Sequence, residues 1–146
     1  MDLAGLDVTA WGVDPDDPQL SRPLADLPLK QPIVLSPQAS AGEAIERMRD
    51  GHEGCVFVED DSEGIVGVFT ERDVTVRIAA RGRDPKRTLL EDVMTRQPTA
   101  LQKDDPLSWA LHRMGVDGHR HIPILDDRRL IGFLSIRTVL RALLEA

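Results

Sequence analysis

The chain has little that would suit it to general binding of nucleic acid or lipid. It contains no tyrosine, and its aromatic residues are two tryptophans and three phenylalanines among 146 residues. Stacking platforms for single-stranded nucleic acid are therefore not expected. Lysine and arginine number 18 against 25 aspartates and glutamates, a formal charge of −7. This balance argues against general affinity for nucleic acid or anionic membranes, although a local basic pocket stays possible.

Cysteine and long apolar runs are also scarce. The one cysteine, Cys55, excludes an internal disulfide and a cysteine-rich zinc cluster. It lies in the apolar run 55–58, where a small buried hydrophobe is favoured over a reactive thiol. No apolar stretch approaches the roughly 18 residues of a membrane span. The N-terminus is acidic where a signal peptide is basic. We therefore expect a cytoplasmic globular protein that needs no metal or cofactor and does not associate with membranes.

An internal repeat is the first positive signal. A shift of 66 positions places Leu24, Asp26, Gln31, Pro32 and Leu35 on Leu90, Asp92, Gln97, Pro98 and Leu101. After a one-residue deletion the shift becomes 65, and Gly67, Arg72 and Val74 meet Gly132, Arg137 and Val139. The apolar pattern stays in step throughout, which indicates a tandem duplication.

Each copy has the same succession of expected elements. A short extended piece (33–35; 99–101) precedes a helix, which begins with a capping box at residues 40–43 in the first copy. In the second copy, Asp105 suits the N-cap and Pro106 the first helical position. Two strands joined by an Asp-rich turn follow (55–58 and 65–69; 122–125 and 130–134). Closing helices start at Thr70, ending near Gly82, and at Ser135, running to the chain end.

The predicted fold class is α+β, with two tandem β-α-β-β-α units packed sheet to sheet as one pseudo-symmetric module. The expected organisation is an arm at 1–22, a first domain at 23–82, a linker at 83–88 and a second domain at 89–146. The arm is rich in aspartate and proline, which disfavours regular structure. Trp11 could still dock it on the body or on a neighbouring subunit, and both alternatives stay open.

Several motifs resemble those of CBS (cystathionine-beta-synthase) domains. The segment 67–73, Gly-Val-Phe-Thr-Glu-Arg-Asp, resembles the end of such a domain, and residues 132–138 are its counterpart. Residues 92–95 and 118–124 are also typical of this family. The resemblance covers residues 24–144. The chain resembles a free-standing pair of CBS domains, which is also called a Bateman module. This resemblance implies a regulatory, non-catalytic protein that binds adenine-containing ligands between its copies, commonly as a homodimer.

The resemblance gives Thr70 and Asp73 a binding role. A helix N-terminus suits a phosphate, and a carboxylate three residues later can accept hydrogen bonds from both hydroxyls of a ribose. The structural alternative is a plain capping box, in which Asp73 bonds back to the Thr70 amide. In the second copy Thr138 replaces the carboxylate, so the cleft with Ser135, Ile33, Leu35 and Cys55 is expected to be the weaker site.

The resemblance also places second-copy residues opposite Thr70 and Asp73. These wall residues would be Thr99, Leu101, His119, Arg120 and His121. Arg120 offers a planar guanidinium suited to phosphate oxygens, unless it points outward to a surface carboxylate. The histidines would add further N–H donors.

The function we expect is a sensor of AMP, ADP or ATP that signals to an unknown effector protein. One alternative is a dimerisation or interaction scaffold that has lost ligand binding. Another is the same pocket holding S-adenosylmethionine, NAD or a cyclic dinucleotide.

Overall fold

The computed structural model describes residues 14–96 and 98–144. Trp11 and most of the arm lie outside the described residues, and so does the end of the closing helix at 145–146. The chain divides into two compact units. Unit 1 contains the described residues of 14–31 and 99–144, and unit 2 contains those of 32–98. Each has a sheet and helices, which confirms the α+β class.

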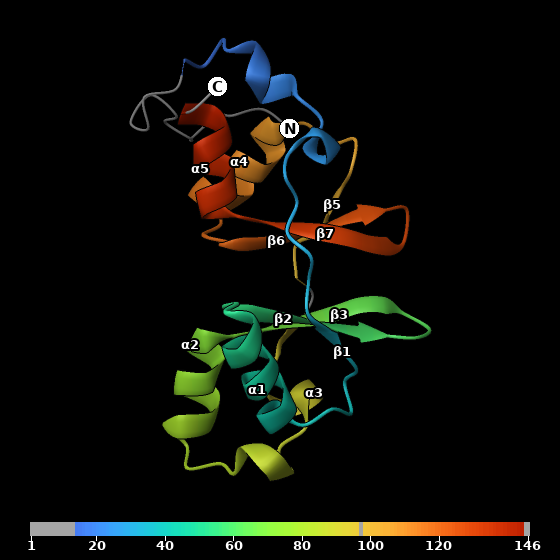
Figure 1. The fold of residues 1–146 in the computed structure, drawn as a ribbon, viewed down its shortest axis with the longest axis vertical. Helices are drawn as coiled ribbons and strands as arrows, with labels where there is room; N and C mark the ends of the chain where they lie inside the picture. Colours follow the sequence, from blue (N-terminus) through green and yellow to red (C-terminus); the bar gives the residue numbers. More distant parts are fainter. Residues whose placement is uncertain (1–13, 97, 145–146) are drawn as a thin grey trace. The chain divides into compact units, whose positions relative to one another are not determined.

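Unit 2 is built on a four-stranded sheet with the order β1-β2-β3-β4. Its strands are β1 (Val34–Leu35), β2 (Cys55–Asp60), β3 (Gly64–Thr70) and β4 (Thr95–Arg96). Its helices are α1 (Ala41–Gly51), α2 (Glu71–Asp73), continued by a π-helix (Val74–Ala79), and α3 (Leu90–Val93). The helices cover one face of the sheet, and the β2–β3 hairpin extends to one side (Figure 1). β4, which pairs antiparallel with β3, was not predicted.

Unit 1 repeats this plan with a three-stranded sheet of order β5-β6-β7. Its strands are β5 (Leu101–Gln102), β6 (His121–Asp126) and β7 (Arg129–Ser135). Its helices are α4 (Leu107–Gly115) and α5 (Ile136–Leu144), preceded in the sequence by short 3-10 turns η2 (Pro18–Ser21) and η3 (Leu24–Asp26). Both hairpins contain the same register shift, between Val58 and Glu59 and between Ile124 and Leu125. The predicted strands are therefore present. The four hairpin strands are longer than the apolar runs from which they were predicted, whereas β1 and β5 are two residues long, shorter than the predicted extended pieces 33–35 and 99–101.

The helix α1 forms for the reasons that its sequence suggests. The Ser40 hydroxyl accepts a hydrogen bond from the Glu43 backbone N–H at 3.0 Å, which caps the first turn. Ala41, Ala44 and Met48 are its buried residues, and His52, in the left-handed conformation at φ 53°, ends it.

The start of α4 differs from the prediction. Pro106 is the N-cap, and the helix begins at Leu107. The Asp105 carboxylate instead accepts a hydrogen bond from the Gln102 backbone N–H at 2.7 Å. The prediction that Asp105 is the N-cap is therefore wrong, because its carboxylate is hydrogen-bonded within the turn that precedes the helix.

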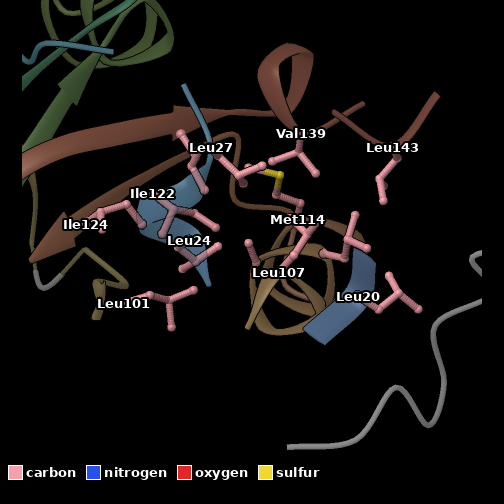
Figure 2. Packing of buried hydrophobic residues seen from close by; sticks show 13 residues of the cluster. Leu20, Leu24, Leu27, Leu101, Leu107, Met114, Ile122, Ile124, Val139 and Leu143 are labelled. Atoms are coloured by element: carbon pink, nitrogen blue, oxygen red, sulfur yellow. The ribbon is translucent and has the colours of Figure 1, made fainter. Parts of the chain in front are cut away.

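The segments that lead into the two copies are exchanged between the units. Leu20, Leu24 and Leu27, which come before the first strand of the first copy, are buried in the core of unit 1 with Leu107 and Ile122 (Figure 2). Lys30 exchanges backbone hydrogen bonds with Phe133 of β7, at 3.0 Å in each direction. Conversely, Leu90, Val93 and Met94 lie in the unit 2 core. The compact units therefore divide the chain differently from the sequence copies.

The linker 83–88 is ordered as part of unit 2. Pro85–Arg87 is a 3-10 turn (η5), and the Asp84 carboxylate caps it by accepting from the Lys86 N–H at 3.0 Å. The Ala41 N–H donates to the carbonyl of buried Thr88 at 2.8 Å. The segment is thus a packed turn against the start of α1.

Candidate functional site

Thr70 and Asp73 meet at the junction between β3 and α2. Thr70 ends the strand and is the N-cap of the helix. The Thr70 hydroxyl accepts from the Asp73 N–H at 3.3 Å, and the Thr70 N–H donates to Asp73 Oδ2 at 3.0 Å. This reciprocal pair is a complete capping box, so the structural alternative for these residues is realised. A capping box does not consume all the acceptor positions of a carboxylate, so binding of a further donor is chemically open.

Asp73 has two further partners that the sequence analysis missed. The residue is 5% exposed. The Thr95 hydroxyl on β4 lies 3.3 Å from Asp73 Oδ1 and 3.4 Å from Oδ2. The Arg77 Nε lies 3.5 Å from Oδ1. The buried carboxylate is therefore surrounded by donors, as a charged group with so little exposure requires.

Arg77 also ties the π-helix to the segment that follows α3. Its Nη1 donates to the Met94 carbonyl at 2.6 Å and lies 3.4 Å from the Val93 carbonyl oxygen. The spacing of four residues between Asp73 and Arg77 is a helical pair that could have been found from sequence. Thr95 follows Asp73 by 22 positions on another element, and no periodicity signals that contact.

The second copy has the same cap without the charge. The Thr138 N–H donates to the Ser135 hydroxyl at 3.3 Å, and the two hydroxyl oxygens lie 3.2 Å apart. Two neutral hydroxyls replace the hydroxyl and carboxylate of the first copy. A hydroxyl is a weaker acceptor than a carboxylate. It also has one oxygen, so it cannot offer a separate acceptor oxygen to each hydroxyl of a diol.

The wall residues predicted from the second copy all belong to unit 1, whereas Thr70 and Asp73 belong to unit 2. Among them, Thr99 and His119 come together, with Oγ1 and Nε2 3.1 Å apart. His121 is half-buried at the start of β6, its ring 6.1 Å from that of Phe133. Leu101 lies in the unit 1 core.

Arg120 is exposed. Within the described residues, its side chain makes no hydrogen bond or ion pair, so the alternative of an outward pair with a carboxylate is not realised there. Its backbone carbonyl accepts from the Ile136 N–H at 3.2 Å, at the start of α5. The guanidinium is thus free of internal partners in this part of the chain.

The residues predicted to accompany Ser135 in the weaker cleft lie in unit 2. Ile33 and Leu35 are half-buried against the core of that unit. Cys55 is 1% exposed and lies opposite Thr70 in the β2–β3 pairing. This burial supports the interpretation of Cys55 as a packing residue.

A surface hollow in unit 2 is separate from these residues. It has a volume of about 350 Å³ and is lined by Ser40, Gly42, Glu43, Ile45, Glu46, Asp84, Pro85 and Lys86. None of the predicted site residues lines it, and its charged residues are of both signs. It therefore does not identify a binding chemistry.

Among residues 14–96 and 98–144, no three His, Cys, Asp or Glu side chains are grouped so that they could hold a metal ion. In the same part of the chain, every helix is too short or too polar to cross a bilayer.

Comparison with known proteins agrees with this architecture. An uncharacterized 17.7 kDa protein of Acidianus ambivalens is 33% identical over 113 residues, which cover 77% of this chain and 67% of that protein. The crystal structure of an uncharacterized conserved protein from Pyrococcus horikoshii superposes with a TM-score of 0.75 at 25% identity, over 84% of this chain and 92% of that one.

A CBS domain protein from Pyrobaculum aerophilum, PAE2072, was solved in complex with AMP. It matches with a TM-score of 0.71 at 23% identity, over 85% of this chain and 99% of that one. The chain spans 56% and 24% of the length of two curated relatives, from Methanopyrus kandleri and Arabidopsis thaliana.

The family assignment rests on the chain itself as well as on these likenesses. The family model described as the CBS domain matches residues 24–80 and again residues 90–145. These are the two copies found by internal similarity, each with its lead-in segment. The chain belongs to the CBS-domain family and carries its CBS domains as a tandem pair.

Proposed function

We propose that this CBS pair is a regulatory module that binds an adenine nucleotide and signals its presence to a partner protein. The observation that carries the proposal is the buried carboxylate of Asp73 at the strand-to-helix junction of the first CBS domain. The AMP complex of PAE2072 supports the choice of ligand class, since that protein shares the fold.

The chemistry assigned to the site follows from its donors and acceptors. Asp73 would accept hydrogen bonds from the ribose hydroxyls, and Thr70 would bind near it through its hydroxyl. Thr99, His119, Arg120 and His121 would contribute from the second copy, with Arg120 binding phosphate oxygens. Leu101 would contribute apolar surface. The proposed role is regulatory rather than catalytic.

A ligand can regulate only by binding one arrangement of the protein more tightly than another. We place that change in the packing of the CBS pair, or of a homodimer of pairs, and its readout in an effector protein. Size-exclusion chromatography with light scattering, with and without ligand, tests the homodimer directly.

The first experiment is thermal unfolding of the purified protein with AMP, ADP, ATP, S-adenosylmethionine, NAD and a cyclic dinucleotide, after removal of any nucleotide that co-purifies. A ligand at about 100 times its dissociation constant adds about 2.7 kcal/mol to the free energy of unfolding. For a chain of this size the unfolding midpoint then rises by roughly 5–10 °C. A selective shift with one class of compound identifies the ligand class.

The matched variants are Asp73→Asn and Ser40→Ala. Ser40→Ala removes the hydroxyl that caps α1 and is expected to lower the free energy of unfolding by about 0.5–2 kcal/mol. Asp73→Asn removes the charge and one acceptor oxygen but leaves an amide oxygen that can accept from the Thr70 N–H, so it should also lower the stability of unit 2. Only Asp73→Asn should also abolish the shift produced by ligand. A ligand shift that survives in Asp73→Asn with unchanged affinity contradicts the site assignment.

One observation favours a second function, that of an interaction scaffold without a ligand. Asp73 already has hydrogen-bond donors in Thr70 and Thr95 and an ion pair with Arg77. In a scaffold these contacts would be purely structural. The scaffold predicts no shift with any compound of the panel.

A further inference from the structure

The most informative contact of Asp73 is the one that comes from another element. Thr70 lies in the same capping box, and Arg77 lies one helical turn further along. Thr95 instead belongs to β4, an edge strand of the sheet. Its hydroxyl lies across both carboxylate oxygens, 3.3 Å from Oδ1 and 3.4 Å from Oδ2.

The Thr95 hydroxyl occupies the position that the hydroxyls of a ribose would need in order to bind Asp73. A vicinal diol binds a carboxylate by donating one hydrogen bond to each oxygen. Asp73 Oδ2 already accepts from the Thr70 N–H at 3.0 Å and from the Thr70 hydroxyl at 3.2 Å. The Thr95 hydroxyl spans the two oxygens, so a diol cannot reach both while that hydroxyl stays in place.

The contact between the Thr95 hydroxyl and the carboxylate is also one that a ligand can displace. The distances from this hydroxyl to the carboxylate are long for a hydroxyl bound to an ionised oxygen, which is ordinarily 2.5–2.7 Å away. Thr95 is exposed, so water can satisfy its hydroxyl once it turns away. The Thr70 N–H is fixed in the capping box and would continue to orient the carboxylate.

We propose that the Thr95 hydroxyl is an internal competitor for Asp73, which the ribose of the ligand displaces, and that it lowers the preference of the site for ribose over deoxyribose. The inference rests on the proposed function and names a further specificity-determining residue for it. Because a ligand with one hydroxyl needs one carboxylate oxygen, Thr95 can keep part of its contact in that case. A diol must displace it completely.

Arg77 is the positioning residue in this scheme. Its Nε lies 3.5 Å from Oδ1, and its Nη1 is fixed by the Met94 carbonyl at 2.6 Å. The guanidinium is thereby anchored to the backbone immediately before Thr95. It would hold Oδ1 in place after the hydroxyl has left.

The test is calorimetric titration of the full chain with AMP and with 2′-deoxy-AMP. Thr95→Val removes the hydroxyl but keeps the β-branched shape that suits a strand. We expect it to bind AMP roughly three- to tenfold more tightly than the parent, the worth of one net hydrogen bond. The gain for 2′-deoxy-AMP should be smaller, so the ratio of the two affinities rises.

Two control variants isolate the hydroxyl. Thr95→Ser keeps it and should bind both nucleotides like the parent. Thr75→Val removes an exposed hydroxyl that donates to the Glu71 carbonyl at 3.3 Å and does not contact Asp73, so its affinities should also be those of the parent. A structural effect of Thr95→Val alone would not change the ratio of AMP to 2′-deoxy-AMP affinity.

The outcomes separate this inference from the proposed function. If the parent binds AMP and Thr95→Val binds it equally or more weakly, the inference is overturned and the proposed function stands. If Thr95→Val binds AMP when the parent does not, the inference is supported in its strongest form. If neither protein binds any adenine nucleotide, the proposed function fails, and the inference that rests on it fails too.

Discussion

Gly132 on β7 lies so close to Leu29 that a Cβ at position 132 would stand 2.8 Å from the Leu29 Cβ. The same added atom would lie 3.1 Å from the Lys30 carbonyl oxygen. Residues 29–30 cannot easily retreat, because Lys30 is hydrogen-bonded to Phe133 in both directions. The glycine therefore permits the lead-in segment to pack on the sheet of unit 1. Gly67 has the matching role in unit 2, where its neighbours are Met94 and Thr95.

Gly132→Ala is expected to lower the free energy of unfolding by about 1–3 kcal/mol, the usual cost of overpacking. Gly67→Ala should cost less, because the atoms nearest to the new Cβ are the Sδ and Cγ of Met94, a flexible side chain that can move aside. Urea unfolding of each variant measures the difference.

Gly42→Ala is the matched control for both. This glycine lies in α1, and its nearest neighbours would be 3.5 Å from an added Cβ, an ordinary contact. Here alanine should raise the free energy of unfolding by about 0.5–1 kcal/mol, since glycine is a poor helix former. A Gly132→Ala variant as stable as the parent would contradict the role given to Leu29.

Most of the fold could be predicted because local signals and the repeat agree. The strands follow the apolar runs, and Ser40, Thr70 and Ser135 stand where the helices begin. The exchange of lead-in segments could not be predicted. Internal similarity shows which segments correspond, but not on which core each one packs, and Leu24 and Leu90 fit either apolar core equally well by type.

The candidate site was predictable only where its residues are close in sequence. The three-residue spacing of Thr70 and Asp73 predicts both a capping box and a carboxylate ligand, and the capping box is confirmed. Thr95 could not be found, because β4 is two residues long and its pairing with β3 is tertiary. The binding roles of Thr70, Asp73 and Arg120 stay predictions.

Arg77 should contribute to stability as well as to the site. Arg77→Met keeps an apolar stem but removes the bonds to the Met94 carbonyl and to Asp73. Because the Arg77 side chain is 41% exposed, its ion pair is partly screened by water. We expect a loss of about 1 kcal/mol in urea unfolding. Arg81→Met, at an exposed arginine after the same π-helix, should leave stability within error of the parent. Equal losses in the two variants would contradict the specific role of Arg77.

The turn between β2 and β3 should show a measurable pH response. The Ser62 hydroxyl and N–H donate to Asp60 Oδ1 at 2.7 and 2.8 Å, and the Glu63 N–H lies 3.3 Å away. These hydrogen bonds, the hydroxyl's first, lower the pKa of Asp60 from its ordinary value of 3.8. A lowered pKa in the folded state stabilises the turn above pH 3.8, and that stabilisation is lost as the pH falls through the folded-state pKa.

Ser62→Ala removes the largest of these causes, so the pKa of Asp60 should rise toward 3.8. Titration of the Asp60 carboxyl carbon by NMR measures the change directly. Ser36→Ala, at an exposed serine outside this turn, should leave that titration unchanged. A pKa that does not move in Ser62→Ala would show that the Ser62 bonds do not persist in solution.

Thr138→Asp tests whether the missing carboxylate is what weakens the second cleft. Ser135 already caps α5 by accepting from the residue 138 N–H at 3.3 Å, so an aspartate there can complete the capping box seen at Thr70. An acidic residue in the first helical turn also favours the helix, by about 0.3–1 kcal/mol. We expect the variant to be at least as stable as the parent and to bind additional AMP, seen as a higher stoichiometry in calorimetric titration.

Thr138→Asn is the matched control, because it has nearly the same shape and no charge. It should retain the stoichiometry of the parent, since a neutral amide oxygen is a weaker acceptor for a diol. If Thr138→Asp folds, and binding at Asp73 is intact, but stoichiometry does not rise, the carboxylate is not the limiting element. The limitation would then lie with the other residues assigned to that cleft, of which Cys55 is buried and Ile33 and Leu35 are committed to the unit 2 core.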